Sequence, residues 1–177
     1  GIKVHVIGDT IVDRYNFCSV LGQTTKTPTF SIKKESQETY LGAAGVVSKH
    51  LKSLGADVIF TTIMGEDENS EFAKNDLDAW GIKQNVIVDP SRPTTLKERF
   101  WGDGYKLLQV DTVDSSRISE EITEKLAKAL VETDAEVVIF SDFRHGIFNS
   151  DSVKIFSGII PKTTVKVADS QVSNRWG

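Results

Sequence analysis

The sequence predicts a three-layer α/β fold, in which helices cover both faces of a parallel sheet. Apolar, β-branched segments without polar alternation are typical of strands buried on both sides, and four occur along the chain. Segments with helical spacing lie between them, and this alternation of strand and helix indicates the α/β class. The 177 residues suffice for one such domain with its own core.

The predicted elements alternate along the chain. Strands are predicted over residues 2–9, 58–65, 136–142 and 165–169, and helices over residues 43–54, 70–80 and 119–131. The third helix has the clearest signals, because Ser119 can cap its first turn. Its apolar face consists of Ile122, Leu126 and Leu130.

Two segments interrupt this alternation. Residues 15–40 carry aromatic and β-branched side chains without helical spacing, and residues 94–111 predict a hairpin around a Gly-Asp-Gly turn. We expect the two segments to form one small sheet that stands off the main body as a lid. A small sheet has little core of its own, so we also expect a homodimer that pairs through this lid.

Composition excludes several classes of function. The net charge of −4 argues against a nucleic-acid partner, and no apolar run is long enough for a membrane helix. No signal peptide precedes the first strand, so we expect a cytoplasmic protein. One cysteine, Cys18, and three scattered histidines predict no metal site. The sequence lacks a phosphate loop, a dinucleotide fingerprint and a G-x-S-x-G elbow.

Candidate ligand-binding residues follow the first strand. Asp9 and Asp13 lie in GDTIVDRY, and ligands of open α/β sheets bind at the carboxyl ends of the strands. A carboxylate there can accept hydrogen bonds from a polyol, although it can equally cap a helix or lie in a solvated loop. The turn Gly-Ala-Ala-Gly at 42–45 begins a helix. Its small residues allow either a ligand or a neighbouring strand to come close.

Five segments resemble, in order, the PfkB (ribokinase-like) family of carbohydrate kinases, and most closely its heptose 7-phosphate kinases. They are VIGDTIVDRY, LGAAGVVSKHLKSLGA, PTTLKERFWGDGYKLLQVD, VVIFSDFRHGIF and VADSQVSNRWG. The resemblance covers nearly the whole chain. It implies one incomplete ribokinase-like domain over residues 1–177: a Rossmann-like parallel sheet with a β lid, truncated at the C-terminus.

The resemblance also implies roles for residues near the sugar. Asp13 corresponds to the substrate aspartate, and Gly42 and Ala43 correspond to a small-residue turn that gives the sugar room and backbone donors. Three departures leave the identity of the sugar open. Ala43 stands where the family signature has its second glycine. Val46 stands where the family has an asparagine that contacts sugar hydroxyls, and His145-Gly146 stands where the heptose kinases often have Lys-Gly.

Basic residues of the lid are candidates for binding an anionic group. Lys97 and Arg99 are two apart on one strand and therefore lie on the same face. The resemblance implies that they reach a substrate group such as a sugar phosphate, and an exposed basic strand is the alternative. Asp142 and Arg144 follow the third strand at the same sheet edge and are weighed similarly.

The resemblance implies the substrate-binding N-terminal part of an ATP- and Mg²⁺-dependent sugar or sugar-phosphate kinase. In this family a Gly-Ala-Gly-Asp motif supplies the anion hole and the catalytic base, and that motif does not occur in these 177 residues. We therefore expect no catalytic residue, no tight ATP or Mg²⁺ binding and no phosphoryl transfer in this chain alone. A short non-catalytic sugar-binding or assembly module, or an unrelated α/β domain, are the alternatives.

Overall fold

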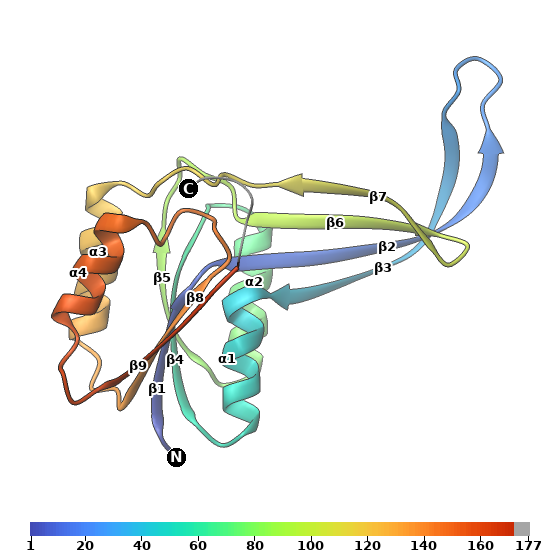
Figure 1. Cartoon of the computed structure of the whole chain (residues 1–177). Helices are drawn as coiled ribbons and strands as arrows, with labels where there is room; N and C mark the ends of the chain where they lie inside the picture. The colour runs from blue at the N-terminus through green and yellow to red at the C-terminus, as the bar shows by residue number, and fades with distance from the viewer. Residues whose placement is uncertain (172–177) are drawn as a thin grey trace.

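The computed structural model describes residues 1–171 and contains a five-stranded and a four-stranded sheet (Figure 1). The five-stranded sheet has the order β5-β4-β1-β8-β9, and every neighbouring pair is parallel. Its strands are β1 (Lys3–Gly8), β4 (Asp57–Met64), β5 (Lys83–Val88), β8 (Val137–Asp142) and β9 (Val165–Ser170). This arrangement confirms the predicted parallel sheet.

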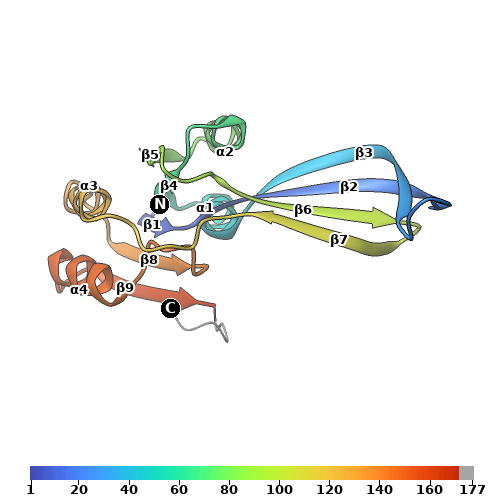
Figure 2. The same ribbon diagram turned by 90° about the horizontal axis from the view of Figure 1, so that it is seen from above.

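Helices cover both faces of this sheet, which confirms the three layers (Figure 2). One face carries α1 (Ala43–Ser53) and α2 (Glu68–Ala79), and the other carries α3 (Glu120–Val131) and α4 (Ser150–Ile159). Two apolar clusters fill the spaces between helices and sheet. The cluster under α1 and α2 includes Val6, Phe60, Ala44, Ala73 and Leu77. The cluster under α3 and α4 includes Ile7, Ile122, Leu126, Leu130 and Phe156.

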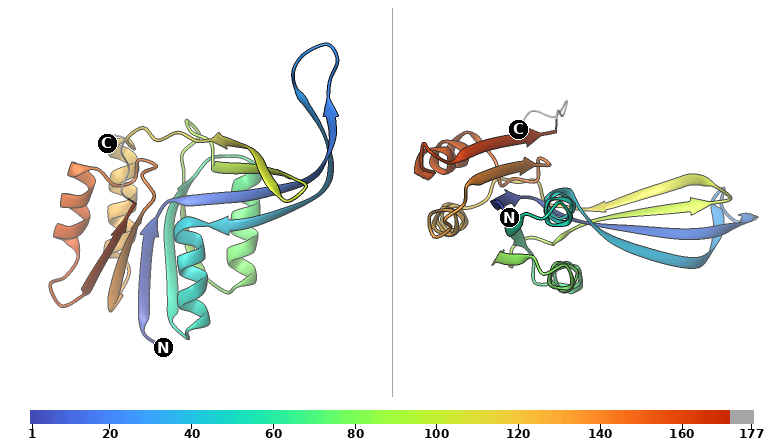
Figure 3. Two further views of the ribbon diagram at one scale, coloured as in Figure 1. Left: turned by 45° about the vertical axis from the view of Figure 1, so that its right-hand side comes forward. Right: turned by 90° about the horizontal axis from the view of Figure 1, so that it is seen from below.

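The four-stranded sheet stands off this body as the predicted lid (Figure 3). Its order is β3-β2-β6-β7, and the central pair β2·β6 is parallel while the outer pairs are antiparallel. Its strands are β2 (Thr10–Gln23), β3 (Phe30–Gly42), β6 (Thr95–Gly102) and β7 (Tyr105–Thr112). The tip of the β2–β3 hairpin extends past the turn between β6 and β7 (Figures 1 and 3).

The lid begins earlier than expected. Strand β2 starts at Thr10, two residues after β1 ends, because Ile11 and Val12 favour an extended backbone. Asp13 therefore lies within a lid strand rather than in a loop after β1. Two elements were not predicted: β5, and α4, whose cap Asn149 accepts backbone N–H groups from Asp151 and Ser152. None of the helices within the described residues is long and apolar enough to cross a membrane.

Candidate functional site

The turn from β3 into α1 brings the backbone against a carboxylate. A Cβ atom at Gly42 would lie 2.3 Å from Oδ2 of Asp13, which is the neighbouring strand's side chain. Any larger residue here would displace the Asp13 carboxylate from its present position. Ala43 follows with a φ of 51°, a left-handed conformation that costs an alanine about 1–2 kcal/mol. The turn is therefore shaped around Asp13.

Asp13 is paired with the guanidinium of Arg99 across the parallel β2·β6 ladder. Both side chains are about one-fifth exposed, at 22% for Asp13 and 20% for Arg99. Arg99 also lies 5.2 Å from the ring centre of Tyr15, within the range of a cation–π contact. Asp13 and Arg99 can therefore be reached by a small molecule while their charges balance each other.

Lys97 occupies the same face of β6, directly beside Asp13 in the strand register. Its Nζ lies 3.0 Å from Oδ2 of Asp111 on β7. Burial alone would raise the pKa of Asp111, but hydrogen bonds from Gln109 and Lys97 outweigh it and lower that pKa. Two cations and two carboxylates thus alternate on one face of the lid base. An incoming anionic group would compete with the carboxylates for both cations.

Asp9 is turned away from this face and into the loop between β8 and α4. Its Oδ2 accepts hydrogen bonds from the backbone N–H groups of Phe143, at 2.7 Å, and His145, at 3.4 Å. The residue is only 3% exposed, and burial raises its pKa to about 7. Asp9 ties the end of β1 to this loop.

Asp142 lies at the same sheet edge and is also bonded within the protein. Its Oδ1 accepts from the backbone N–H of Arg144 at 2.8 Å, and its Oδ2 accepts from Ser170 Oγ at 2.7 Å. The Arg144 guanidinium lies 3.6 Å from the same carboxylate.

The last of the predicted site residues, Val46, is half-buried in the first turn of α1. The structure therefore gathers Asp13, Lys97 and Arg99 on one face and leaves Asp9 between β1 and β2 and Asp142 at the end of β8.

Sequence reasoning missed Arg92, which joins three loops at this edge. Its Nε lies 2.9 Å from Asp89 Oδ2, and its two terminal nitrogens lie 3.4 Å from the carbonyl oxygens of His145 and Ser116. The side chain is only 9% exposed. An isolated arginine before a proline carries no signal of this role in the sequence, because two of its three partners, His145 and Ser116, are distant along the chain.

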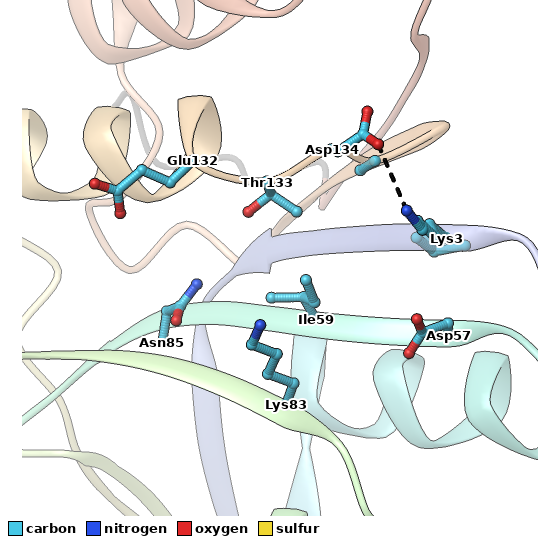
Figure 4. A pocket seen from close by; sticks show the side chains of 10 residues that line it. Lys3, Asp57, Ile59, Lys83, Asn85, Glu132, Thr133 and Asp134 are labelled. Carbon is cyan, nitrogen blue, oxygen red and sulfur yellow. Dashed lines mark hydrogen bonds and ion pairs between the residues drawn. The ribbon is translucent and has the colours of Figure 1, made fainter.

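Two hollows lie outside the face of the lid that carries Asp13, Lys97 and Arg99. One, of about 650 Å³, is bordered by Asp142, Arg144 and Ser170 beside β9. The other, of about 420 Å³, lies at the amino ends of the strands, opposite the edge that carries Asp13 (Figure 4). Lys3 and Asp134 form an ion pair across it, and Lys83 and Asn85 point into it (Figure 4). Neither hollow includes the lid cations.

Comparison with known protein families gives a match over residues 2–139 to the family described as pfkB family carbohydrate kinase. The chain belongs to this family. It is 31% identical over 159 residues to the bifunctional protein HldE of Bradyrhizobium diazoefficiens, covering 87% of this chain and 32% of that protein. It is 30% identical over 166 residues to HldE of Campylobacter jejuni, covering 92% and 34% respectively. The chain thus spans about a third of the length of these relatives.

Solved structures share the fold of this family member. Phosphofructokinase-2 from Escherichia coli, in complex with fructose-6-phosphate, superposes with a TM-score of 0.73 at 13% identity, covering 97% of this chain and 56% of that one. Arabidopsis thaliana ribokinase, complexed with ribose and ATP, gives a TM-score of 0.66 at 17% identity, covering 95% and 53%. These similarities confirm the ribokinase-like fold, of which this chain contains about half.

Proposed function

We propose that the chain is the sugar-binding part of an ATP-dependent kinase that acts on a sugar phosphate, in the manner of a heptose 7-phosphate kinase. One observation carries this proposal: Asp13 lies against Gly42 and beside Lys97 and Arg99 on one accessible face. A carboxylate suits sugar hydroxyls, and two adjacent cations suit a phosphate. A plain sugar carries no anionic group that could contact these two cations.

Each predicted residue has a part in this proposal. Asp13 accepts hydrogen bonds from sugar hydroxyls once Arg99 turns toward the phosphate. Gly42 and Ala43 leave room for the sugar at the start of α1, and Val46 presents an apolar surface there. Asp9 and Asp142 fix the loops of the sheet edge, because their carboxylates accept hydrogen bonds from backbone N–H groups of the loop after β8.

ATP and Mg²⁺ would supply the phosphoryl group and its charge neutralisation. Within residues 1–171, no group of three or more His, Cys, Asp or Glu side chains is placed to hold a metal ion. We propose that the 177-residue chain binds the sugar without phosphorylating it. Sugar-dependent release of ADP by the purified chain would contradict this.

Binding of a matched pair of sugars tests the proposal. Calorimetric titration of the chain with sedoheptulose 7-phosphate and with sedoheptulose should give a Kd at least tenfold lower for the phosphorylated sugar. Arg99→Leu should abolish this preference, and Lys33→Leu, at an exposed lysine far along the lid, should leave it unchanged. Equal affinity for the two sugars would contradict a sugar-phosphate substrate. It would favour the alternative of a general sugar-binding module.

A second variant tests the place of Val46. A sugar hydroxyl buried against this side chain would lose a hydrogen bond, at a cost of about 1–3 kcal/mol. In a complete kinase that contains this segment, Val46→Asn should therefore change the ratio of kcat/KM between plain and phosphorylated sugars about tenfold. An unchanged ratio would place Val46 in helix packing instead.

A further inference from the structure

His145 lies beside strand β6, next to the end of the face that carries Lys97 and Arg99. Its Nδ1 is 3.3 Å from Thr95 Oγ1, and the ring is half-buried. Thr95, Lys97 and Arg99 alternate along β6, so their side chains share one face at a spacing of about 7 Å. The imidazole therefore rests on the residue that precedes Lys97 on the face that Asp13 also occupies.

The loop around His145 is held from three sides. Its backbone N–H donates to Asp9, and its carbonyl oxygen accepts from Arg92 at 3.4 Å. Gly146 follows with a φ of 98°, and a Cβ atom there would lie 2.0 Å from the carbonyl oxygen of Ser116. These contacts fix the backbone, and the Thr95 hydroxyl fixes the ring. A rigidly placed side chain of this kind is suited to ligand recognition rather than to a mobile surface.

The free nitrogen of the ring is available to a ligand. Within residues 1–171, Nε2 of His145 makes no hydrogen bond, and it is not among the buried polar atoms that lack a partner. With Nδ1 directed to Thr95, a protonated imidazole would present an N–H from Nε2. It would add a third cationic donor beside Lys97.

We propose that His145 binds the anionic group of the substrate together with Lys97 and Arg99, and that this contact makes recognition of the sugar phosphate depend on pH. The inference rests on the proposed function and adds a residue to its site. Protonation of the ring couples to binding: a phosphate that approaches Nε2 favours the imidazolium, which takes up a proton from solvent. Affinity therefore rises as the pH falls, until the ring is protonated in the free protein as well.

The charges that face the ring come from every surrounding element. Burial lowers the pKa of His145 most, and Lys97 on β6 lowers it further, while Asp111 on β7 and Asp142 on β8 raise it. Asp9 and Arg92 bind the backbone of the same loop, and together with Asp114 they line the same small hollow as His145. The net direction is downward, so the ring of the free protein is neutral at pH 7. A bound phosphate opposes the effect of Lys97 and thereby raises the pKa of His145.

The test compares affinities at two pH values. The Kd for sedoheptulose 7-phosphate is measured by calorimetry at pH 6.0 and pH 8.0 for the wild type, His145→Gln and His145→Lys. The phosphate itself titrates near pH 6, and this contribution is the same for all three proteins. The ratio of Kd at pH 8.0 to Kd at pH 6.0 should be at least about threefold larger for the wild type than for His145→Gln, because a pKa rise of one unit on binding changes affinity by at most tenfold and pH 6.0 captures only part of that change.

Two further measurements keep the outcome clear. His145→Lys carries a permanent charge, so it should have the small ratio of His145→Gln with tighter binding at pH 8.0. His50→Gln, at an exposed histidine on α1, should have the wild-type ratio. In the wild type, the His145 ring signals in NMR spectra should titrate at higher pH after the ligand is added, and this measurement needs no variant.

The result that overturns the inference is an equal ratio in the wild type and His145→Gln, or an unchanged His145 pKa on binding. If binding then still depends on Arg99, only the role of His145 is wrong. If the wild type does not distinguish the phosphorylated from the plain sugar at either pH, the proposed function and this inference both fail.

Discussion

The carboxylate of Asp13 lies so close to Gly42 that a Cβ atom at this position would force it to move. Gly42→Ala would place a Cβ atom 2.3 Å from Oδ2 of Asp13 and push that side chain off Arg99. We expect a loss of about 1–3 kcal/mol in the free energy of unfolding, measured by urea denaturation, and weaker sugar binding. Gly158→Ala in α4 is the matched control, because no atom lies within 4 Å of its added Cβ. Its stability should stay the same or rise by about 0.5–1 kcal/mol. Equal midpoints for wild type and Gly42→Ala would contradict the contact.

The same residues show which features of the candidate site can be predicted from the sequence. Asp13, Gly42 and the shared face of Lys97 and Arg99 follow from motif and strand period. The pairing of Asp13 with Arg99 does not, because 86 residues separate them and only the parallel β2·β6 register brings them together. Ion pairs across a sheet depend on tertiary register, which no local pattern contains.

At the scale of elements, Asp9 connects β1 to the loop before α4, and its titration should be visible in stability. Burial raises its folded-state pKa to about 7, above the usual 3.8. The native state therefore binds this proton more tightly than the unfolded chain, so its contribution to stability is present at pH 4 and is lost as the pH rises to about 7. In the wild type, the free energy of unfolding should fall by about a few kcal/mol from pH 4 to pH 7 because of Asp9. In Asp9→Asn this fall should be absent. Denaturation at pH 4, 5.5 and 7 tests this. A parallel pH dependence in both proteins would mean that Asp9 is ionised throughout.

Two peripheral elements, β5 and α4, were not predicted, although the edge strand β9 was. The central strands β1, β4 and β8 are continuous apolar runs, and α3 has a full apolar face, so pattern alone locates them. Strand β5 is only half-buried, and its first residues, Lys83 to Asn85, are polar. Helix α4 contains Gly158 and buries only Ser152 and Phe156. Because β5 and α4 bury few apolar side chains, their hydrophobic period is weak.

At the scale of the whole molecule, the lid extends from the body (Figure 3). Large apolar side chains are exposed along it: Leu21 at 65%, Phe30 at 70%, Tyr105 at 76% and Leu108 at 55%. Exposed apolar surface of this extent is typical of an interface, and a sheet that stands off a domain has no core beneath it. We propose that two copies of the chain pair through their lids and cover this surface.

Sedimentation of the chain over a range of concentrations tests this dimer. The wild type should sediment as a dimer, and Phe30→Glu together with Leu108→Glu should shift it to a monomer, because a charge buried in an apolar interface costs several kcal/mol. Leu54→Glu is the matched control, since Leu54 is 84% exposed but lies at the end of α1, away from the lid. It should leave the dimer intact. A wild-type monomer at high concentration would contradict the proposal, and so would a dimer that persists in the double variant. Because Asp13, Lys97 and Arg99 lie at the base of the same sheet, loss of the dimer should also weaken binding of the sugar phosphate, as rigid strands position those side chains.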